Sequence, residues 1–371
     1  METVRSNSRL FLHMRLYRFP LVLAAATVAC TAPPAAREVA TATYTNPVLD
    51  ADFPDPTVVG ASDGHYYAYA TQTERGGETL NIQVARSDDL VHWETLGDAL
   101  PVKPAWADST QDFWAPHVSE HGGVFYLYYS AKPDAALADT TRGLCLGVAT
   151  ARAARGPFAD SGQPLRCGPG FVNIDPMQFD DPATGKPLLY WGSGLEPIRV
   201  QELAPDRTSF APGSAPRDVV TPVETTDRTI YQRLVEGAWV TYEAPWYYLF
   251  YSGDNCCGVD AHYAVMVARS RSATGPFETL AAATGRAQSV ILERGGRWSA
   301  PGHNSIVRDA SGQSWIVYHA IDEGAPSVES ERRQADTRRV MLIDRLRYEN
   351  GWPAVDSGHP SASPRPAPRA R

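Results

Sequence analysis

Three acidic residues and a histidine occupy nearly equivalent positions of a repeated pattern in this sequence. Asp55, Asp175, Glu236 and His303 each lie 11 to 13 residues before a segment rich in aromatic residues, and Trp114 holds the same place in one further unit. Equivalent positions of a radial repeat come together around its axis. Carboxyl groups that face each other across a gap can perform general acid–base chemistry, and two of them suffice to hydrolyse a glycosidic bond.

The aromatic segments define the elements that must position these residues. They are YYAYAT (66–71), FYLYYS (125–130), LLYWGS (188–193), YYLFYS (247–252) and WIVYHA (315–320), and they begin 59, 63, 59 and 68 residues apart. A near-constant period of this length indicates one unit repeated five times. Each unit has a short first segment, a turn, the aromatic strand and a third strand. Short strands in a radial repeat predict an all-β fold, a five-bladed β-propeller whose first strands line the channel.

The two aspartates share a local motif. Asp55 and Asp175 each precede a proline, and an Asp-Pro pair on its own often marks only a turn. Two such pairs at equivalent positions of the repeat weaken that explanation for both. Asp52 is a nearby competitor for the role of Asp55.

Glu236 lies in the segment RLVEGAWVTYE (233–243), among apolar neighbours. Apolar surroundings disfavour the charged form of a carboxyl group, so we expect its pKa to be raised. A raised pKa is what a general acid requires near neutral pH. The alternative is a structural ion pair with an arginine such as Arg233.

Composition excludes some classes of partner. The 371 residues carry a net charge of −8, and removal of residues 1–30, which contain four Arg and one Glu, changes it to −11. An acidic domain repels phosphate backbones, so the sequence predicts no nucleic-acid partner and favours a neutral polysaccharide or oligosaccharide. A Gly-rich phosphate loop, a Ser-centred elbow and an HExxH motif are all missing from the sequence.

Five segments in order resemble the blade-opening motifs of glycoside hydrolase family 43. They are NPVLDADFPDPTVV, FWAPHV, NIDPMQF, LVEGAWV and GHNSIV, and the resemblance spans residues 45–353. It implies a five-bladed propeller of inverting enzymes that act on arabinose and xylose linkages. By this match, Asp55 is the general base and Glu236 the general acid. Asp175 modulates the pKa of the general acid and helps to orient the catalytic groups.

The same resemblance suggests further site residues. His303 matches a family histidine that often helps to hold a hydrated metal, commonly calcium; the alternative is a core histidine that only forms hydrogen bonds. Trp114 is a candidate sugar platform or a blade-packing residue. Arg338 and Arg339 are candidates for binding a sugar hydroxyl, and at least one of them is expected to be a solvated charge. Many members have an acidic residue where this chain has His117, which weakens inferences about subsites there.

The resulting hypothesis is an inverting glycosidase for arabinose- or xylose-containing plant polysaccharides, with α-L-arabinofuranosyl linkages favoured. The ending GHNSIV, VYHA, RRVMLID and NGWP resembles that of arabinan-cleaving members. Alternatives are a β-xylosidase of the same fold, a retaining glycosidase or transferase acting on fructosyl bonds, and a carbohydrate-binding propeller without catalysis. Endo and exo cleavage stay open, and we expect a monomer without an organic cofactor.

The ends of the chain predict export. Residues 1–30 resemble a secretory signal peptide, whose apolar run is too short to span a membrane. Cys30 loosely fits a lipoprotein cleavage site, and the alternative is ordinary cleavage near Ala29 or after the alanines at 35–36. The protein is therefore expected to be secreted or held at the cell envelope. Residues 31–43 are expected to be a linker, 44–355 the propeller, and 356–371 a disordered tail.

Export also permits disulfides. The expected pairs are Cys145 with Cys167 and Cys256 with Cys257, although the adjacent pair is equally compatible with free thiols. The loop SGDNCCGVDAHYAV (252–265) either borders the cleft or is a stapled surface loop.

Overall fold

The structure is a computed structural model that describes residues 11–16, 42–192, 194–328 and 336–371. The chain divides into two units, Met1–Ala40 and Thr41–Arg371, and the second contains all of the regular secondary structure described below. The predicted signal peptide and Cys30 lie largely outside the described residues, as does most of the predicted linker.

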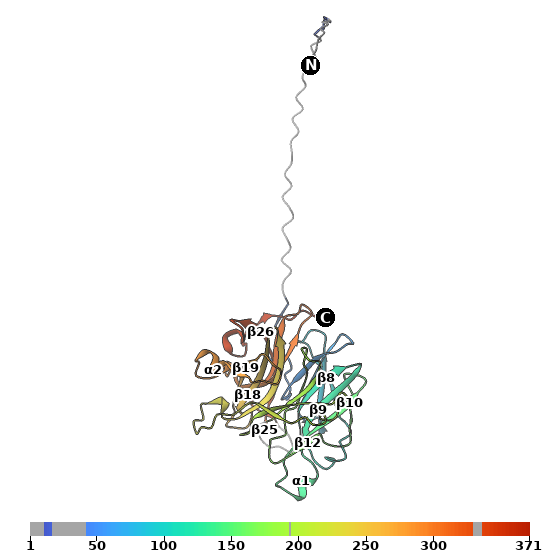
Figure 1. The fold of residues 1–371 in the computed structure, drawn as a ribbon, viewed down its shortest axis with the longest axis vertical. Coiled ribbons are helices and arrows are strands. Elements are labelled where there is room, and N and C mark those ends of the chain that lie inside the picture. The colour runs from blue at the N-terminus through green and yellow to red at the C-terminus, as the bar shows by residue number, and fades with distance from the viewer. Residues whose placement is uncertain (1–10, 17–41, 193, 329–335) are drawn as a thin grey trace, which may run out of the picture. The chain divides into compact units, whose positions relative to one another are not determined.

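Five antiparallel sheets form the second unit, one for each predicted repeat (Figure 1). The strands of the first three blades are β2 (Thr57–Gly60), β3 (Tyr66–Ala70), β6 (Gln83–Ser87) and β7 (Glu94–Asp98); β8 (Phe113–His121), β9 (Val124–Ala131), β10 (Cys145–Ala151), β11 (Ala159–Asp160) and β12 (Arg166–Cys167); and β13 (Met177–Asp180), β14 (Pro187–Trp191), β15 (Ile198–Glu202) and β16 (Arg217–Val220). Those of the last two are β17 (Val235–Glu243), β18 (Trp246–Asn255), β19 (His262–Ser270), β20 (Glu278–Thr279) and β21 (Val290–Leu292); and β22 (Trp298–Arg308), β23 (Ser314–Asp322), β26 (Arg339–Glu349) and β27 (Trp352–Val355). The predicted five-bladed β-propeller is confirmed.

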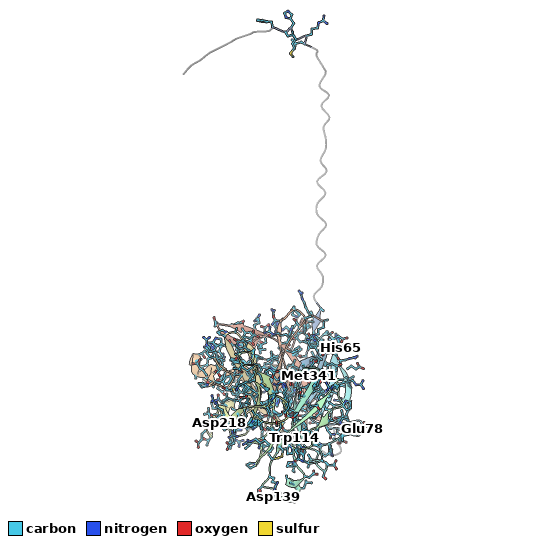
Figure 2. The ribbon with its side chains drawn as sticks, turned by 45° about the vertical axis from the view of Figure 1, so that its right-hand side comes forward. His65, Glu78, Trp114, Asp139, Asp218 and Met341 are labelled. Carbon is cyan, nitrogen blue, oxygen red and sulfur yellow. A yellow bond between two sulfur atoms is a disulfide. The ribbon has the colours of Figure 1, made fainter. Side chains whose placement is uncertain are left out.

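Short elements decorate the blades. They are the pairs β1 (Thr43–Tyr44) with β28 (Arg365–Pro366), β4 (Thr73–Arg75) with β5 (Glu78–Leu80) and β24 (Ser327–Val328) with β25 (Asp336–Thr337), together with α1 (Ala135–Ala138), α2 (Leu280–Thr284), η1 (Tyr231–Arg233) and η2 (Asp356–Gly358). Asp139, beside α1, lies at the edge of the propeller, whereas the fully buried Met341 lies inside it (Figure 2).

The aromatic segments form the second strand of each blade, in its middle. All five residues of β3 and all nine of β23 are buried, because both faces of a blade pack against neighbouring blades. Such strands need apolar residues on both faces, which explains why they read as nearly continuous aromatic runs. Five hydrophobic clusters fill the five interfaces between blades.

Antiparallel order decides which end of the propeller can carry a site. The first strand of each blade begins at the end where the second strand finishes and the third begins. Asp55, Trp114, Asp175 and Glu236 lie at or just before the beginnings of the first strands, so they share this end with the loops that join second and third strands. These loops include residues 132–144 and 256–261. His303 lies midway along β22, the longest of the first strands.

The expectation of a disordered tail at 356–371 is wrong. β28 pairs with β1, the Ser361 backbone N–H donates to Asp344 Oδ2 at 3.2 Å, and the Asn46 side chain donates to Ser361 Oγ at 3.0 Å. Farther on, the Arg371 guanidinium stacks on the ring of Tyr66 at 4.4 Å. The segment thus runs from the fifth blade to the first, and its polar groups find partners that composition cannot reveal.

Both expected disulfides are present. Cys145–Cys167 joins β10 to β12, and Cys256–Cys257 lies in the loop that follows β18. Within the described residues, no helix is long and apolar enough to cross a membrane.

Candidate active site

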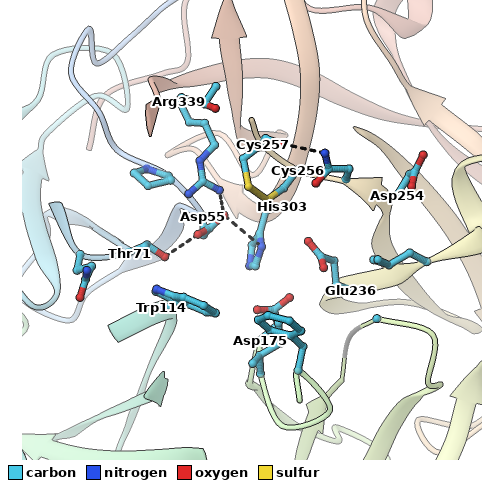
Figure 3. A pocket seen from close by; sticks show the side chains of 18 of the residues that line it. Asp55, Thr71, Trp114, Asp175, Glu236, Asp254, Cys256, Cys257, His303 and Arg339 are labelled. Carbon is cyan, nitrogen blue, oxygen red and sulfur yellow. Dashed lines mark hydrogen bonds and ion pairs between the residues drawn. A yellow bond between two sulfur atoms is a disulfide. The ribbon is translucent and has the colours of Figure 1, made fainter. Parts of the chain in front are cut away.

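The predicted residues meet in one pocket at the end of the channel (Figure 3). Asp55, Trp114, Asp175, Glu236 and His303 all line it, and each comes from a different blade. The cavity volume is about 350 Å³, within the range of small-molecule sites. The register of the repeat therefore places these side chains as the sequence predicted.

A backbone conformation repeated at the blade entrances turns these side chains toward the axis. Asp55 and Asp175 both have φ 57°, His303 has φ 47°, and the residues that follow Trp114 and Glu236 also have positive φ. Aspartate tolerates this left-handed region better than most residues other than glycine. Sparsely populated conformations of this kind concentrate at functional sites.

Polar residues at the ends of the aromatic strands fix these entrances. Thr71 Oγ1 accepts the Ala115 backbone N–H at 2.8 Å. In the same way, Ser130 Oγ accepts the N–H of Asp175 at 3.0 Å, Ser252 Oγ that of His303 at 2.8 Å, and His319 Nδ1 that of Asp55 at 3.1 Å. In these four cases a blade holds the entrance of the next, and the T or S that ends three of the aromatic segments, with the H that comes one residue before the end of WIVYHA, was the overlooked sequence signal.

Asp55 is held as a carboxylate. Thr71 Oγ1 donates to Oδ2 at 2.6 Å, and the Arg339 guanidinium donates to Oδ1 at 2.9 Å. Burial by itself raises the pKa of Asp55, but the positive charge of Arg339, followed by His303 and His319, outweighs burial and holds the pKa well below its usual range. An ionised carboxylate in this position can accept a proton. Asp52, the competitor, instead accepts bonds from Thr73 Oγ1 and the Arg339 backbone N–H.

Asp175 has the opposite electrostatic environment. Its carboxyl group is buried and accepts the Gly237 N–H at Oδ2 over 3.0 Å. Burial, followed by the charges of Glu236 and Asp55, raises its pKa well above the usual value. Neighbouring carboxyl groups with pKa values displaced in opposite directions are typical of acid–base sites.

Asp175→Asn is predicted to stabilise the fold in a pH-dependent manner. Because the folded-state pKa of Asp175 is raised, the carboxyl group is protonated in both states below its unfolded pKa, about 3.9, and its charge disfavours folding progressively above it. The variant should match the wild type near pH 3 and exceed its Tm by a few degrees at pH 7–8. Thermal unfolding from pH 3 to 8 measures this, with the exposed Asp108→Asn as control. An equal shift at every pH would contradict the assignment.

The backbone brings Glu236 close to Asp175, because Gly237, the residue after Glu236, donates its N–H to the Asp175 carboxyl group. The fully buried Tyr263 donates its hydroxyl to Glu236 Oε1 at 2.7 Å. Arg233, the ion-pair partner considered from the sequence, instead lies 2.5 Å from Asp254 Oδ1. Tyr263 was not identified from the sequence, because its segment reads as an ordinary third strand.

An aromatic wall borders the pocket. The rings of Trp114 and Phe171 stack with centroids 6.1 Å apart and planes at 15°, and both line the cavity. Phe171 is 57% exposed, and its ring lines the cavity beside Trp114. It lies four residues before Asp175, a proximity that could have identified it.

The two candidate arginines differ. Arg339 lines the pocket and bonds to Asp55, so its first role is to orient that carboxylate. Arg338 is not among the pocket-lining residues and donates instead to Asp50 Oδ1 at 2.5 Å and to the Asp50 carbonyl at 2.8 Å. The side chains of Arg338 and Arg339 are only 19% and 14% exposed and both are ion-paired, so neither is the solvated charge that was expected for at least one of them.

His303 faces both the pocket and a small chamber below it. Its Nδ1 lies 3.5 Å from Asp55 Oδ1. Burial lowers the pKa of His303, and it lowers that of His117, which lines the chamber, to about 3. The chamber also contains Thr57 and Asn304, whose side-chain polar atoms are buried without protein partners.

Known proteins resemble this chain over most of its length. A probable arabinan endo-1,5-alpha-L-arabinosidase A from Aspergillus flavus is 28% identical over 314 residues, covering 81% of this chain and 90% of the relative. An extracellular endo-alpha-(1->5)-L-arabinanase 1 from Bacillus subtilis is 27% identical and covers 81% and 86%. The crystal structure of a thermostable family-43 glycoside hydrolase matches with a TM-score of 0.70 and 29% identity, covering 89% of this chain and all of that one.

A structure of an alpha-L-arabinanase from Cellvibrio cellulosa, complexed with arabinohexaose, shares the fold at 22% identity with a TM-score of 0.66, covering 82% and 96%. The model of the family described as glycosyl hydrolases family 43 matches residues 44–353. That match contains all five blades and every pocket residue discussed above. The protein is therefore a glycosidase that belongs to glycosyl hydrolase family 43.

Proposed function

We propose that this glycosidase cleaves the α-1,5-L-arabinofuranosyl linkages of arabinan internally and with inversion of configuration. The observation that carries the proposal is the pocket in which Asp55, Asp175 and Glu236 meet with opposed pKa shifts on the two aspartates. The names of the Aspergillus flavus and Bacillus subtilis relatives support arabinan as substrate.

The proposed mechanism gives one proton transfer to each of two carboxyl groups. Glu236 donates its proton to the glycosidic oxygen as the bond to the anomeric carbon breaks, while Asp55 takes a proton from the water that attacks the opposite face. Glu236 ends as a carboxylate and Asp55 as an acid, and exchange with solvent restores both. Inversion requires the two carboxyl groups to lie roughly 6.5–9.5 Å apart, with room for the water.

Asp175 prepares Glu236 for this role. Since Asp175 lies close enough for mutual repulsion, the pair resists losing a second proton, which favours a protonated general acid. The Gly237 N–H fixes the Asp175 carboxyl group from the backbone of the acid's own strand. Trp114 and Phe171 supply an apolar face on which a pentose ring can stack.

Substrate choice and stereochemistry test the proposal. Linear arabinan should release short oligosaccharides of mixed length, and NMR of the first product should show the inverted anomer. Activity confined to xylosides would instead indicate a β-xylosidase. Retention of the anomeric configuration would contradict the inverting assignment. Binding of arabinan without turnover would indicate a carbohydrate-binding propeller.

Tyr263→Phe is predicted to lower kcat about tenfold and to move the alkaline limb of the pH–rate profile to higher pH. The Tyr263 hydroxyl stabilises the ionised form of Glu236, so its removal raises the pKa of the general acid. The control is Tyr251→Phe, which removes a similarly buried hydroxyl bonded to Gln232. A loss of Tm with an unmoved alkaline limb would mean that Tyr263 is only structural.

We also propose that the channel holds a hydrated calcium ion beside His303. Among the residues described, no three His, Cys, Asp or Glu side chains are grouped to bind a metal directly. The unpartnered groups of Thr57, His117 and Asn304 nevertheless fit the hydrogen-bonding needs of metal-bound water. When bound, the ion would supply positive charge that offsets repulsion among the three carboxyl groups.

Metal removal tests this proposal. Treatment with EDTA should lower Tm by several degrees and reduce activity, and calcium should restore both, because the carboxyl groups then regain a compensating charge. The measurement is thermal unfolding combined with metal analysis by mass spectrometry. If the metal-free protein keeps its Tm and its activity, the calcium proposal is wrong.

Export and anchoring remain proposals as well. The Bacillus subtilis relative is named extracellular, which supports secretion. We propose cleavage of the predicted signal peptide and secretion of a monomeric propeller, with a lipid anchor at Cys30 as the alternative. The mass of the exported protein distinguishes a diacylglyceryl cysteine from simple cleavage, and light scattering gives the oligomeric state.

A further inference from the structure

One feature of the pocket takes no part in the acid–base chemistry. The loop that follows β18 presents the Cys256–Cys257 disulfide to the cavity, together with Asn255. The other disulfide, Cys145–Cys167, ties β10 to β12 and is not among the pocket-lining residues. The sequence left open whether the loop borders the cleft, and the structure places it there.

The strand register puts the disulfide above the general acid. Glu236 on β17 is opposite Ser252 on β18, and β18 continues outward from that level. Cys256 lies four residues beyond Ser252, or about 13 Å along an extended strand. In Figure 3 the disulfide lies above His303, and the Trp114 ring lies below it and to the left.

Several contacts hold this loop in place. The Asn255 side chain donates to the Cys257 carbonyl at 2.9 Å, and the Gly258 N–H donates to Thr337 Oγ1 at 2.6 Å, which reaches the fifth blade. Cys256 also packs against the cluster that contains Tyr263, the residue bonded to Glu236. The loop is therefore preorganised, so binding a sugar to it costs little ordering entropy.

We propose that the Cys256–Cys257 disulfide is the apolar surface that supports the sugar on the leaving-group side of the cleaved bond. This rests on the proposed function, because the general acid contacts the leaving oxygen and the disulfide stands beyond Glu236 on the same blade. Adjacent cysteines joined by a disulfide present two polarizable sulfur atoms without a hydrogen-bonding side chain. Such a surface suits the C–H face of a pentose.

The test compares Cys256→Ser/Cys257→Ser with the matched pair Cys145→Ser/Cys167→Ser. We expect the first variant to raise KM for linear arabinan about tenfold while kcat falls less than threefold. It should also shift the bonds cleaved in end-labelled arabinohexaose, since one subsite is weakened. The control pair should show the wild-type cleavage pattern.

Reduction of the folded wild type with a phosphine gives a second measurement that does not depend on refolding a variant. It should reproduce the change in KM and cleavage pattern and have no further effect on Cys256→Ser/Cys257→Ser. If the wild type cleaves arabinan and both the serine variant and the reduced protein keep its KM and cleavage pattern, the inference is overturned. If the wild type does not cleave or bind arabinan at all, the proposed function itself fails.

Discussion

Glu236→Gln should lower kcat/KM for linear arabinan by about 10²–10⁴-fold, the usual contribution of a general acid. Glutamine keeps the size of the side chain and can still accept the Tyr263 hydroxyl bond, but it has no proton to give to the leaving oxygen. A dinitrophenyl arabinofuranoside has a leaving group that needs no proton. On that substrate the loss should be smaller than about tenfold.

The comparison between substrates separates acid catalysis from general damage. Glu243→Gln is the matched control, because Glu243 ends the same strand and pairs with Arg308 away from the pocket. It should keep near-wild-type rates on both substrates. An equal loss for Glu236→Gln on arabinan and on the dinitrophenyl glycoside would argue that Glu236 positions the substrate and does not protonate it.

Asp55→Asn should lower activity by about 10²–10⁴-fold on both substrates alike. The attacking water needs a base whatever the leaving group, and an amide cannot accept its proton. The variant still offers an oxygen to Thr71 and Arg339, so binding of an oligosaccharide should change much less than kcat. Rates and binding measured on the same preparation make the distinction.

Asp52→Asn decides between the two neighbouring aspartates. Asp52 also lines the pocket, but its carboxylate already bonds to Thr73 and to the Arg339 backbone. We expect this variant to lose at most about tenfold. If Asp52→Asn is inactive while Asp55→Asn turns over, the base is Asp52.

The pH dependence gives an independent reading of Asp55. Its pKa is held well below the usual range, mainly by Arg339 against the opposing effect of burial. Asp55 is therefore ionised at every pH at which an ordinary aspartate is ionised. The acid limb of the kcat/KM profile should lie below about pH 4. Arg339→Met should move that limb to higher pH, because it removes the charge that stabilises the carboxylate.

The sequence by itself determined the repeat, the five-bladed fold and the residues that meet at the axis. It could do so because the period of the aromatic strands counts the blades, and a constant offset from each strand puts Asp55, Asp175, Glu236 and His303 at the same place in every blade. It also indicated the two disulfide pairs, which the structure contains. The aromatic strands and the residues at a constant offset from them recur in each repeat, so they can be recognised in a single sequence.

Only the tertiary structure decided which partners those residues have. The bond from Tyr263 to Glu236, the selection of Arg339 over Arg338 for Asp55, and the packing of residues 356–371 across the first and fifth blades join segments far apart in the chain. Such contacts depend on how blades twist and on where side chains find unpaired polar groups, and neither leaves a periodic trace in the sequence. The pKa displacements of Asp55 and Asp175 arise from these same contacts, because burial and neighbouring charges are properties of the assembled site.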